Sequence, residues 1–205
     1  ATIALFNLAL QQPNPGTLLL FSDENSKWML DNSSFSQEWS TLLWQLILKG
    51  YKIKVIHKVS RDIDEMLDVI HQWLPFYTSG AVEPYYYPRL RDGVYKRTLS
   101  VVSGKAAVFA TSIGENMETT ANFMSTDKLT VDSFTNEFYS YLALCKPLIK
   151  IHPAKNIRLV LPELFSFEGR GGSLISRSDA PSLITLPPRV LESISHPLPA
   201  QVTED

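Results

Sequence analysis

Residues 17–57, TLLLFSDENSKWMLDNSSFSQEWSTLLWQLILKGYKIKVIH, decide the fold class of this chain. Residues 17–22 form a nearly continuous apolar run, which is typical of a buried strand in a parallel sheet. Residues 34–49 carry apolar side chains at helical spacing, with a capping box at the start and a glycine just past the end. Residues 51–57 alternate in polarity and predict a second strand. Strand, helix and strand in this order predict a right-handed parallel crossover, the building unit of an α/β fold.

A second helix is predicted after this unit. It is expected to begin after Asp62 and to end at Pro75 and Gly80, since proline and glycine interrupt helices. Its inner stripe is predicted from the apolar residues at helical spacing, which are Ile63, Met66, Leu67, Ile70 and Leu74.

Three more strands are predicted downstream. Residues 81–86 have the pattern of a third strand. Residues 94–102 and 105–111 are predicted to form a hairpin around a two-residue turn, Ser103-Gly104. The predicted order β-α-β-α-β-β-β is that of an α/β domain ending in a hairpin.

Four parts are expected along the chain. Residues 1–16 have the pattern of a helix. This helix is expected either to be an entry or linker from a missing N-terminal domain or to pack on this domain. The first alternative is considered because the sequence opens mid-pattern without Met. Residues 17–114 are predicted to form an α/β region with a mixed, mostly parallel sheet flanked by helices. Residues 115–196 are expected to be a small α+β extension packed on it, with a short edge strand and a helix. Residues 197–205 are rich in proline and acidic residues and are expected to be disordered.

The composition excludes several classes of protein. The chain of 205 residues is 44% hydrophobic and 20% charged, with a formal net charge of −2, so it is no polycation built for nucleic acid. A single cysteine, Cys145, excludes an intrachain disulfide framework and a cysteine-based zinc site. No apolar run reaches the roughly 18 residues of a membrane span. The expectation is a cytoplasmic domain with no cofactor, no bound metal and no membrane partner.

The predicted element order resembles one half of the phospholipase D-like fold. In that family, a strand of the type G-v-k-v-r-v-l, matched here by residues 50–56, precedes a hairpin with the motif H-x-K-x-x-x-x-D-G and a following G-S-x-N. Aligned on the hairpin turn, the motif histidine, lysine and aspartate fall on Lys96, Thr98 and Ser103, and the later Gly-Ser and Asn fall on Ala110-Thr111 and Ile113. The family uses the histidine as a nucleophile. The resemblance therefore implies a pseudoenzyme whose catalytic positions are all replaced, with no catalytic residue and no enzyme activity.

A second resemblance covers residues 71–98, which begin HQWLP and continue through EPYYYP to RDGVYKRT. This segment is similar to the C-terminal region of uncharacterised Firmicutes regulators in which a helix-turn-helix domain comes first. The resemblance implies a non-catalytic effector-sensing or oligomerisation domain of a bacterial transcription regulator, as a homodimer, with DNA bound only by a separate domain. Two alternatives stay open: a protein–protein interaction module without a small-molecule ligand, and a phosphodiesterase-type enzyme.

Candidate ligand-binding residues follow the predicted strands. In α/β sheets, ligands bind outside the carboxyl ends of parallel strands. Residues 49–105 also hold ten basic and six acidic side chains, a local net charge of +4, which suits a small anionic or sugar-like ligand. Tyrosine rings beside an arginine can stack on a ring and hold an anion. The predicted ligand-binding residues are Asp23, His57, Lys58, Tyr85, Tyr87, Arg89, Arg91 and Lys96.

Plainer roles compete with this prediction. His57 could be an inward or edge residue that is satisfied by a backbone group, and the tyrosine segment could be a loop stiffened by prolines that covers the sheet or makes a dimer contact. Alternation places Tyr85 and Tyr87 on one face of the strand and Tyr86 on the other.

Overall fold

The computed structural model describes residues 1–24, 33–58, 63–89, 94–114 and 120–149, together with residues 162, 165 and 166. Contacts divide the chain into two units, Ala1–Ile151 and His152–Asp205. Among the described residues, the strands and the four long helices belong to the first unit. The part of the predicted extension beyond residue 150, the tail 197–205 and the candidate Arg91 lie outside the described residues, apart from the three single positions. The expected domain boundaries therefore stay predictions.

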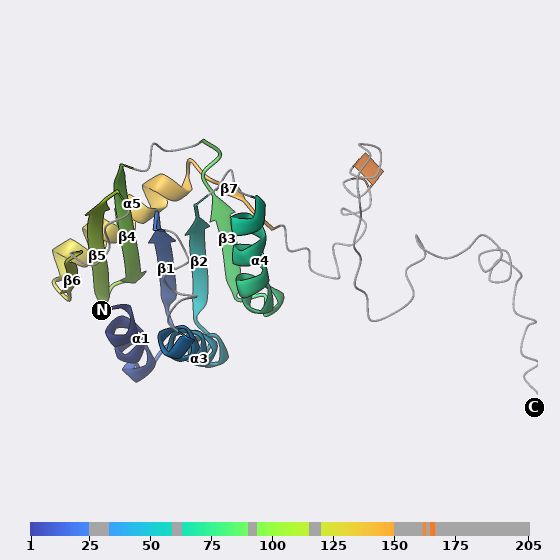
Figure 1. Cartoon of the computed structure of the whole chain (residues 1–205). Helices are drawn as coiled ribbons and strands as arrows, with labels where there is room; N and C mark the ends of the chain where they lie inside the picture. Colours follow the sequence, from blue (N-terminus) through green and yellow to red (C-terminus); the bar gives the residue numbers. More distant parts are fainter. Residues whose placement is uncertain are drawn as a thin grey trace, which may run out of the picture. The chain divides into compact units, whose positions relative to one another are not determined.

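The first unit is built on a mixed sheet of seven strands in the order β6-β5-β4-β1-β2-β3-β7 (Figure 1). The strands are β1 (Thr17–Ser22), β2 (Lys52–His57), β3 (Val82–Tyr86), β4 (Tyr95–Val102), β5 (Ala106–Ile113), β6 (Asn122–Ser125) and β7 (Lys146–Pro147). Parallel pairing is confined to β1, β2 and β3, because the β4–β5 hairpin joins antiparallel to β1. The predicted α/β class with a mixed sheet is confirmed, and so is the short strand β6 at the edge. The sheet is not mostly parallel as predicted, because four of the six pairings between the described strands are antiparallel.

Helices cover both faces of this sheet. They are α1 (Thr2–Gln11), α3 (Ser33–Lys49), α4 (Ile63–Thr78) and α5 (Lys128–Leu142). Helices α1, α3 and α4 lie on one face, called the α3 face below, and α5 lies on the other, called the α5 face (Figure 1). The buried strand β1 contributes Leu18 and Leu20 to the first face and Leu19 and Phe21 to the second. This explains its continuous apolar sequence, since a strand covered on both sides needs no polar alternation.

The end of α3 follows the sequence signals closely. Gly50 has a φ of +97°, a left-handed conformation that favours glycine. Its N–H donates to the Ile47 carbonyl at 2.9 Å, and the N–H of Tyr51 donates to the Leu46 carbonyl at 3.0 Å. This pair of bonds satisfies two of the carbonyls that the end of a helix leaves without partners, so the predicted glycine stop is confirmed.

Helix α1 packs on this domain. Leu5, Phe6 and Ala9 are buried in the core on the α3 face. The hydroxyl of Tyr51 donates to the Ala9 carbonyl at 2.8 Å, and the Lys49 ammonium donates to carbonyls at the end of α1. The packed helix, one of the two alternatives for this segment, is therefore observed, while an entry from a further N-terminal domain stays a prediction.

Helix α4 differs from its prediction in two ways. It runs through Pro75 to Thr78, and the buried side chains among those described are Trp73, Phe76 and Tyr77, whereas Leu67 and Leu74 of the predicted inner stripe are 43% and 47% exposed. Burying three aromatic side chains is worth several kcal/mol, which exceeds the roughly 3 kcal/mol cost of an interior proline. The proline itself lies on the exposed side of the helix, where water can reach the disturbed turn.

The hairpin is confirmed with a correction at its turn. Val102 pairs with Ala106, so the loop has three residues rather than the predicted two. Gly104 has a φ of +69°, and the N–H of Lys105 donates to the Val102 carbonyl at 2.9 Å. Within the described part of the chain, no helix has the length and apolar character needed to cross a membrane.

Candidate functional site

Polar side chains gather on the α3 face where β1 ends. Ser22 is the last residue of β1 and pairs in register with Thr98 of β4, and their hydroxyl oxygens are 2.8 Å apart. Two residues along β4, Lys96 pairs with Ser112 of β5. Because side chains two residues apart share a face of a strand, all four side chains point to the same side of the sheet.

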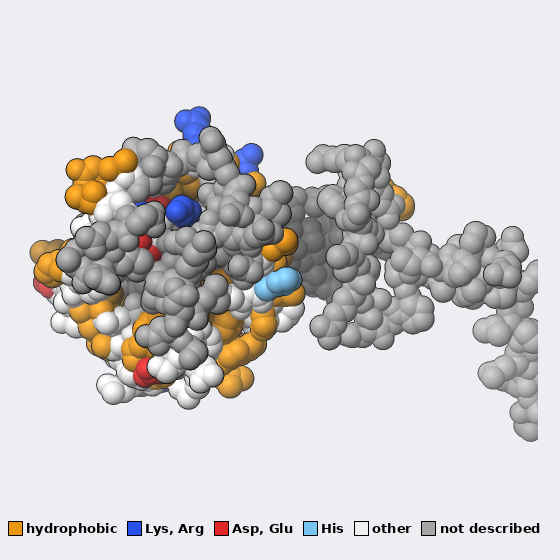
Figure 2. Space-filling model, in the orientation of Figure 1, with side chains coloured by type: hydrophobic (Ala, Val, Ile, Leu, Met, Phe, Trp, Pro, Cys, Tyr) orange, Lys and Arg blue, Asp and Glu red, His pale blue; other side chains and the backbone are white. Residues whose placement is uncertain are grey.

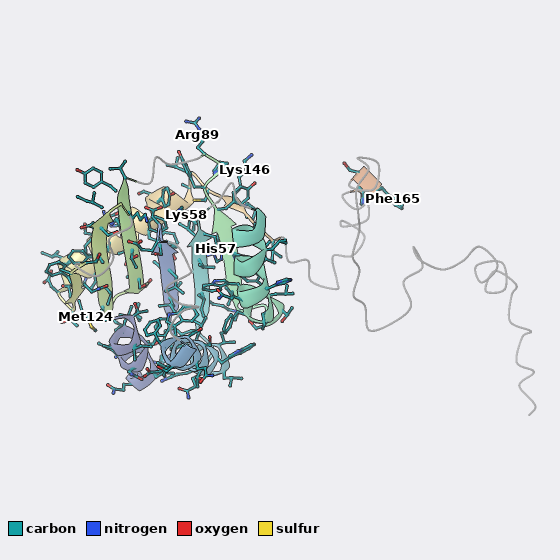
Figure 3. All side chains as sticks on the ribbon, viewed as in Figure 1. His57, Lys58, Arg89, Met124, Lys146 and Phe165 are labelled. Carbon is teal, nitrogen blue, oxygen red and sulfur yellow. The ribbon has the colours of Figure 1, made fainter. Side chains whose placement is uncertain are left out.

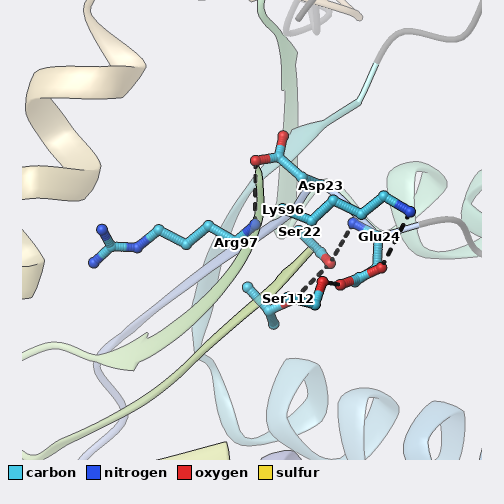
Figure 4. Close-up of polar contacts among 7 residues, drawn as sticks. Ser22, Asp23, Glu24, Lys96, Arg97 and Ser112 are labelled. Atoms are coloured by element: carbon cyan, nitrogen blue, oxygen red, sulfur yellow. Dashed lines mark hydrogen bonds and ion pairs between the residues drawn. The ribbon is translucent and has the colours of Figure 1, made fainter. Parts of the chain in front are cut away.

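Glu24 connects these residues into one network, called the Glu24 cluster here (Ser22, Glu24, Lys96, Thr98 and Ser112; Figure 4). Its backbone N–H donates to the Ser22 hydroxyl at 3.2 Å, and the Ser112 hydroxyl donates to Glu24 Oε1. The Lys96 ammonium lies 3.7 Å from Glu24 Oε2. The two charged side chains are only 2% and 8% exposed, so each compensates the other's buried charge.

Asp23 lies next to the Glu24 cluster, at the contact between β1 and β4. Its side chain is buried, and its Oδ2 accepts a hydrogen bond from the Arg97 N–H at 3.4 Å, while its own N–H donates to the Arg97 carbonyl at 2.8 Å. The Arg97 guanidinium in turn donates to Glu137 of α5 at 2.8 Å and lies over the Phe134 ring. Asp23 thus extends the pairing of β1 with β4.

His57 lies against α4. Its Nε2 is 2.7 Å from the Tyr77 hydroxyl, and its ring meets Trp73 edge-on with the centroids 4.9 Å apart. Burial lowers the pKa of His57 from 6.5 to about 4 and raises the pKa of the Tyr77 phenol. The phenol and the imidazole are therefore both neutral near pH 7 and share one hydrogen bond. The plainer role foreseen for His57 fits this geometry, with a side-chain hydroxyl as partner instead of a backbone group.

Tyr85 in β3 and Tyr87 just after it turn to the α5 face. Tyr85 packs with the core on that side and donates its hydroxyl to Glu83 Oε2 at 2.8 Å, and the Tyr87 ring lies 5.4 Å from the Tyr141 ring of α5. They share a face, as alternation predicts. Both rings are already in contact with other side chains, which matches the covering role more closely than a free stacking platform.

Exposed cations lie at the end of the sheet where β2 and β3 have their carboxyl ends. Lys58 directly follows β2, Arg89 follows β3, and Lys146 pairs in register with Tyr86 at the end of β3 (Figure 3). We call these three residues the basic rim, and Lys and Arg side chains stand out along this side in Figure 2. Lys58 and Arg89 belong to the predicted set. Lys146 does not, because a two-residue strand has no recognisable sequence pattern.

The structure separates the predicted site residues into three groups. Lys96 belongs to the buried Glu24 cluster and Asp23 to the neighbouring β1–β4 contact, whereas Lys58 and Arg89 are exposed at the basic rim. His57, Tyr85 and Tyr87 are engaged with α4, Glu83 and α5 respectively. The described residues contain no group of three or more His, Cys, Asp or Glu side chains that could hold a metal ion.

Comparisons with known proteins give little beyond this geometry. No protein-family model matches the chain, and no curated protein matches it. Nine chains of solved structures match, among them polyphosphate kinase from Porphyromonas gingivalis, with a TM-score of 0.47 and 17% sequence identity. The match covers 82% of this chain, which spans only 28% of that kinase. The activity of this chain has to be inferred from its own residues.

Proposed function

We propose that this chain is a non-catalytic effector-sensing domain of a bacterial transcription regulator. The observation that supports this most is Lys96. It occupies the position where the phospholipase D-like resemblance requires a histidine nucleophile, and there it is buried and paired with Glu24. A protonated ammonium has no lone pair with which to attack phosphorus, so the chemistry of that motif does not carry over to these residues.

The basic rim is the proposed effector site. Lys58, Arg89 and Lys146 are exposed, come from three separate segments and lie where α/β sheets bind their ligands. Among the residues that the structure describes, none of the three forms an ion pair. A small anion with carboxylate or phosphate groups suits this rim better than a neutral sugar.

The test is a thermal-shift screen of the whole chain against nucleotides, sugar phosphates, dicarboxylates and neutral sugars. A ligand at about 100 times its dissociation constant stabilises the folded state by about 2.7 kcal/mol, which is a clear shift in Tm. Lys58→Ala and Arg89→Ala should each weaken the shift. Lys105→Ala is the matched control, since Lys105 is an exposed cation in the β4–β5 turn, at the opposite end of the strands. No shift with any anion, or an equal loss in the control, would refute the proposed site.

A second candidate is a phosphodiesterase-type enzyme with different catalytic groups. The hydroxyl of Ser112 donates to the Glu24 carboxylate, with the Lys96 cation beside it, and a carboxylate hydrogen-bonded to a hydroxyl can act as its general base. This candidate requires turnover of a phosphodiester that Ser112→Ala abolishes and Lys105→Ala preserves. Inactivity of the wild-type chain against a broad phosphodiester panel would remove it.

A further inference from the structure

One carboxylate oxygen of Glu24 lacks a hydrogen bond although it is buried. Glu24 Oε1 accepts from the Ser112 hydroxyl, whereas Oε2 has no hydrogen-bond partner among the residues that the structure describes. The Lys96 ammonium lies 3.7 Å from Oε2, which is close enough to balance its charge but too far for a hydrogen bond. Because a buried acceptor without a donor is costly, this oxygen is a candidate contact for a donor on a ligand.

Glu24 lies at the end of the sheet where α/β proteins bind their ligands. It comes two residues after the end of β1, and Lys58 of the basic rim directly follows β2. Strands β1 and β2 are parallel neighbours, in register up to the pair Phe21 and Ile56, and neighbouring strands lie about 4.8 Å apart. Figure 2 shows basic and acidic side chains next to each other where β1 and β2 end in Figure 1. One small molecule can therefore reach both Lys58 and Glu24.

The Lys96 ammonium determines which kind of donor suits Glu24 Oε2. A ligand ammonium at hydrogen-bond distance from Oε2 would come close to this buried cation and be repelled by it. A hydroxyl is neutral and donates to a carboxylate without that repulsion. Ser22, Thr98 and Ser112 add three hydroxyls to the same network, and each hydroxyl can both donate and accept. The Glu24 cluster is thus suited to a hydroxyl and not to an amine.

We propose that the effector is a hydroxylated anion, such as a polyol phosphate or a hydroxy acid. Its anionic group binds at Lys58, and one of its hydroxyls donates to Glu24 Oε2. This inference rests on the proposed function, because the anionic group needs the basic rim. The two contacts have different effects: Lys58 attracts any small anion, whereas Glu24 selects anions with a hydroxyl, since a site built for a hydroxyl rejects the analogue without it.

The test compares pairs of anions that differ only in their hydroxyls. Isothermal titration calorimetry of the whole chain is run with glycerol phosphate and propyl phosphate, with ribitol phosphate and pentyl phosphate, and with glycerate and propionate. In at least one pair, the hydroxylated anion should bind at least about tenfold more tightly, because it alone donates to the charged acceptor. Ethanolamine phosphate should show no such advantage over ethyl phosphate, because its ammonium is repelled by Lys96.

Variants then assign this preference to Glu24. Glu24→Gln should bring both members of the pair to similar affinities, whereas Lys58→Ala should weaken both by a similar factor. Glu38→Gln is the matched control, since Glu38 is an exposed carboxylate on α3, and it should keep the preference. Circular dichroism shows whether each variant is folded. If Glu24→Gln is not, the double variant Lys96→Met/Glu24→Gln takes its place, because it removes both buried charges.

The possible results separate this inference from the proposed function. Equal affinities within every pair, a preference that survives the loss of the Glu24 carboxylate, or one that Glu38→Gln removes equally would overturn the inference and leave anion binding at the basic rim intact. Binding of none of these anions would refute the basic rim and the selection by Glu24 together.

Discussion

His57 is expected to make the stability of this domain depend on pH well above the range in which carboxylates titrate. Its imidazole is buried against Trp73 and Tyr77, and burial lowers its pKa from 6.5 to about 4. In the unfolded chain the same side chain takes up a proton near pH 6.5. Between these two values the unfolded state binds more protons than the folded state, so stability is lost as the pH falls.

The size of this effect follows from the two pKa values. Above about pH 7.5 the histidine is neutral in both states and its contribution is constant. With pKa values of 6.5 and about 4, linkage gives a loss of about 2 kcal/mol at pH 5 and about 3 kcal/mol at pH 4. Below pH 4 the loss levels off, because both states are then protonated.

Urea unfolding of the whole chain at a series of pH values measures this loss. His57→Gln should flatten the curve between pH 7 and pH 5, because glutamine does not titrate. His71→Gln is the matched control: His71 is exposed on α4, so this variant should keep the pH dependence of the wild type. A wild-type curve that is flat over this interval, or one that His57→Gln leaves unchanged, would refute the reasoning.

Two further predictions concern stability. Lys96→Met should lower the free energy of unfolding by about 3–5 kcal/mol, measured with urea, because it leaves the buried Glu24 carboxylate without its cation. The double variant Lys96→Met/Glu24→Gln should recover part of this loss. A single variant as stable as the wild type would contradict the prediction. Pro75→Ala should stabilise the domain by about 2–3 kcal/mol, since it restores a helical N–H and removes the ring clash inside α4. Thermal unfolding should show a higher Tm, and a lower Tm would contradict the prediction.

Much of the fold is predictable from local patterns. The first strand, the long amphipathic helix with its glycine stop and the hairpin are all strong signals that tertiary contacts reinforce. Helix α4 is the exception. Its predicted end and its predicted buried side were both wrong, and both for the same physical reason. Proline usually ends a helix and leucine usually faces inward, yet the burial of Trp73, Phe76 and Tyr77 against the sheet overrides both tendencies.

The candidate site was harder to foresee, although one signal was present. The observed hairpin is centred on Gly104 and places Ser112 opposite Lys96, whereas the predicted two-residue turn would have placed Thr111 there. Alternation then points both side chains to the same face. The position of Glu24 could not be obtained in this way, because it follows the end of a strand and its side chain is placed by three-dimensional contacts alone.

The position of β1 between β2 and β4 has a consequence for how the chain is made. On the ribosome, β1 and its parallel neighbour emerge early, but the antiparallel neighbour is complete only when Val102 has left the exit tunnel. Until then, one edge of a strongly apolar strand stays open, and open strand edges pair readily with other chains. Synthesis rate and chaperone supply should therefore govern the yield of this protein, and a copy truncated before Val102 would keep that edge open permanently.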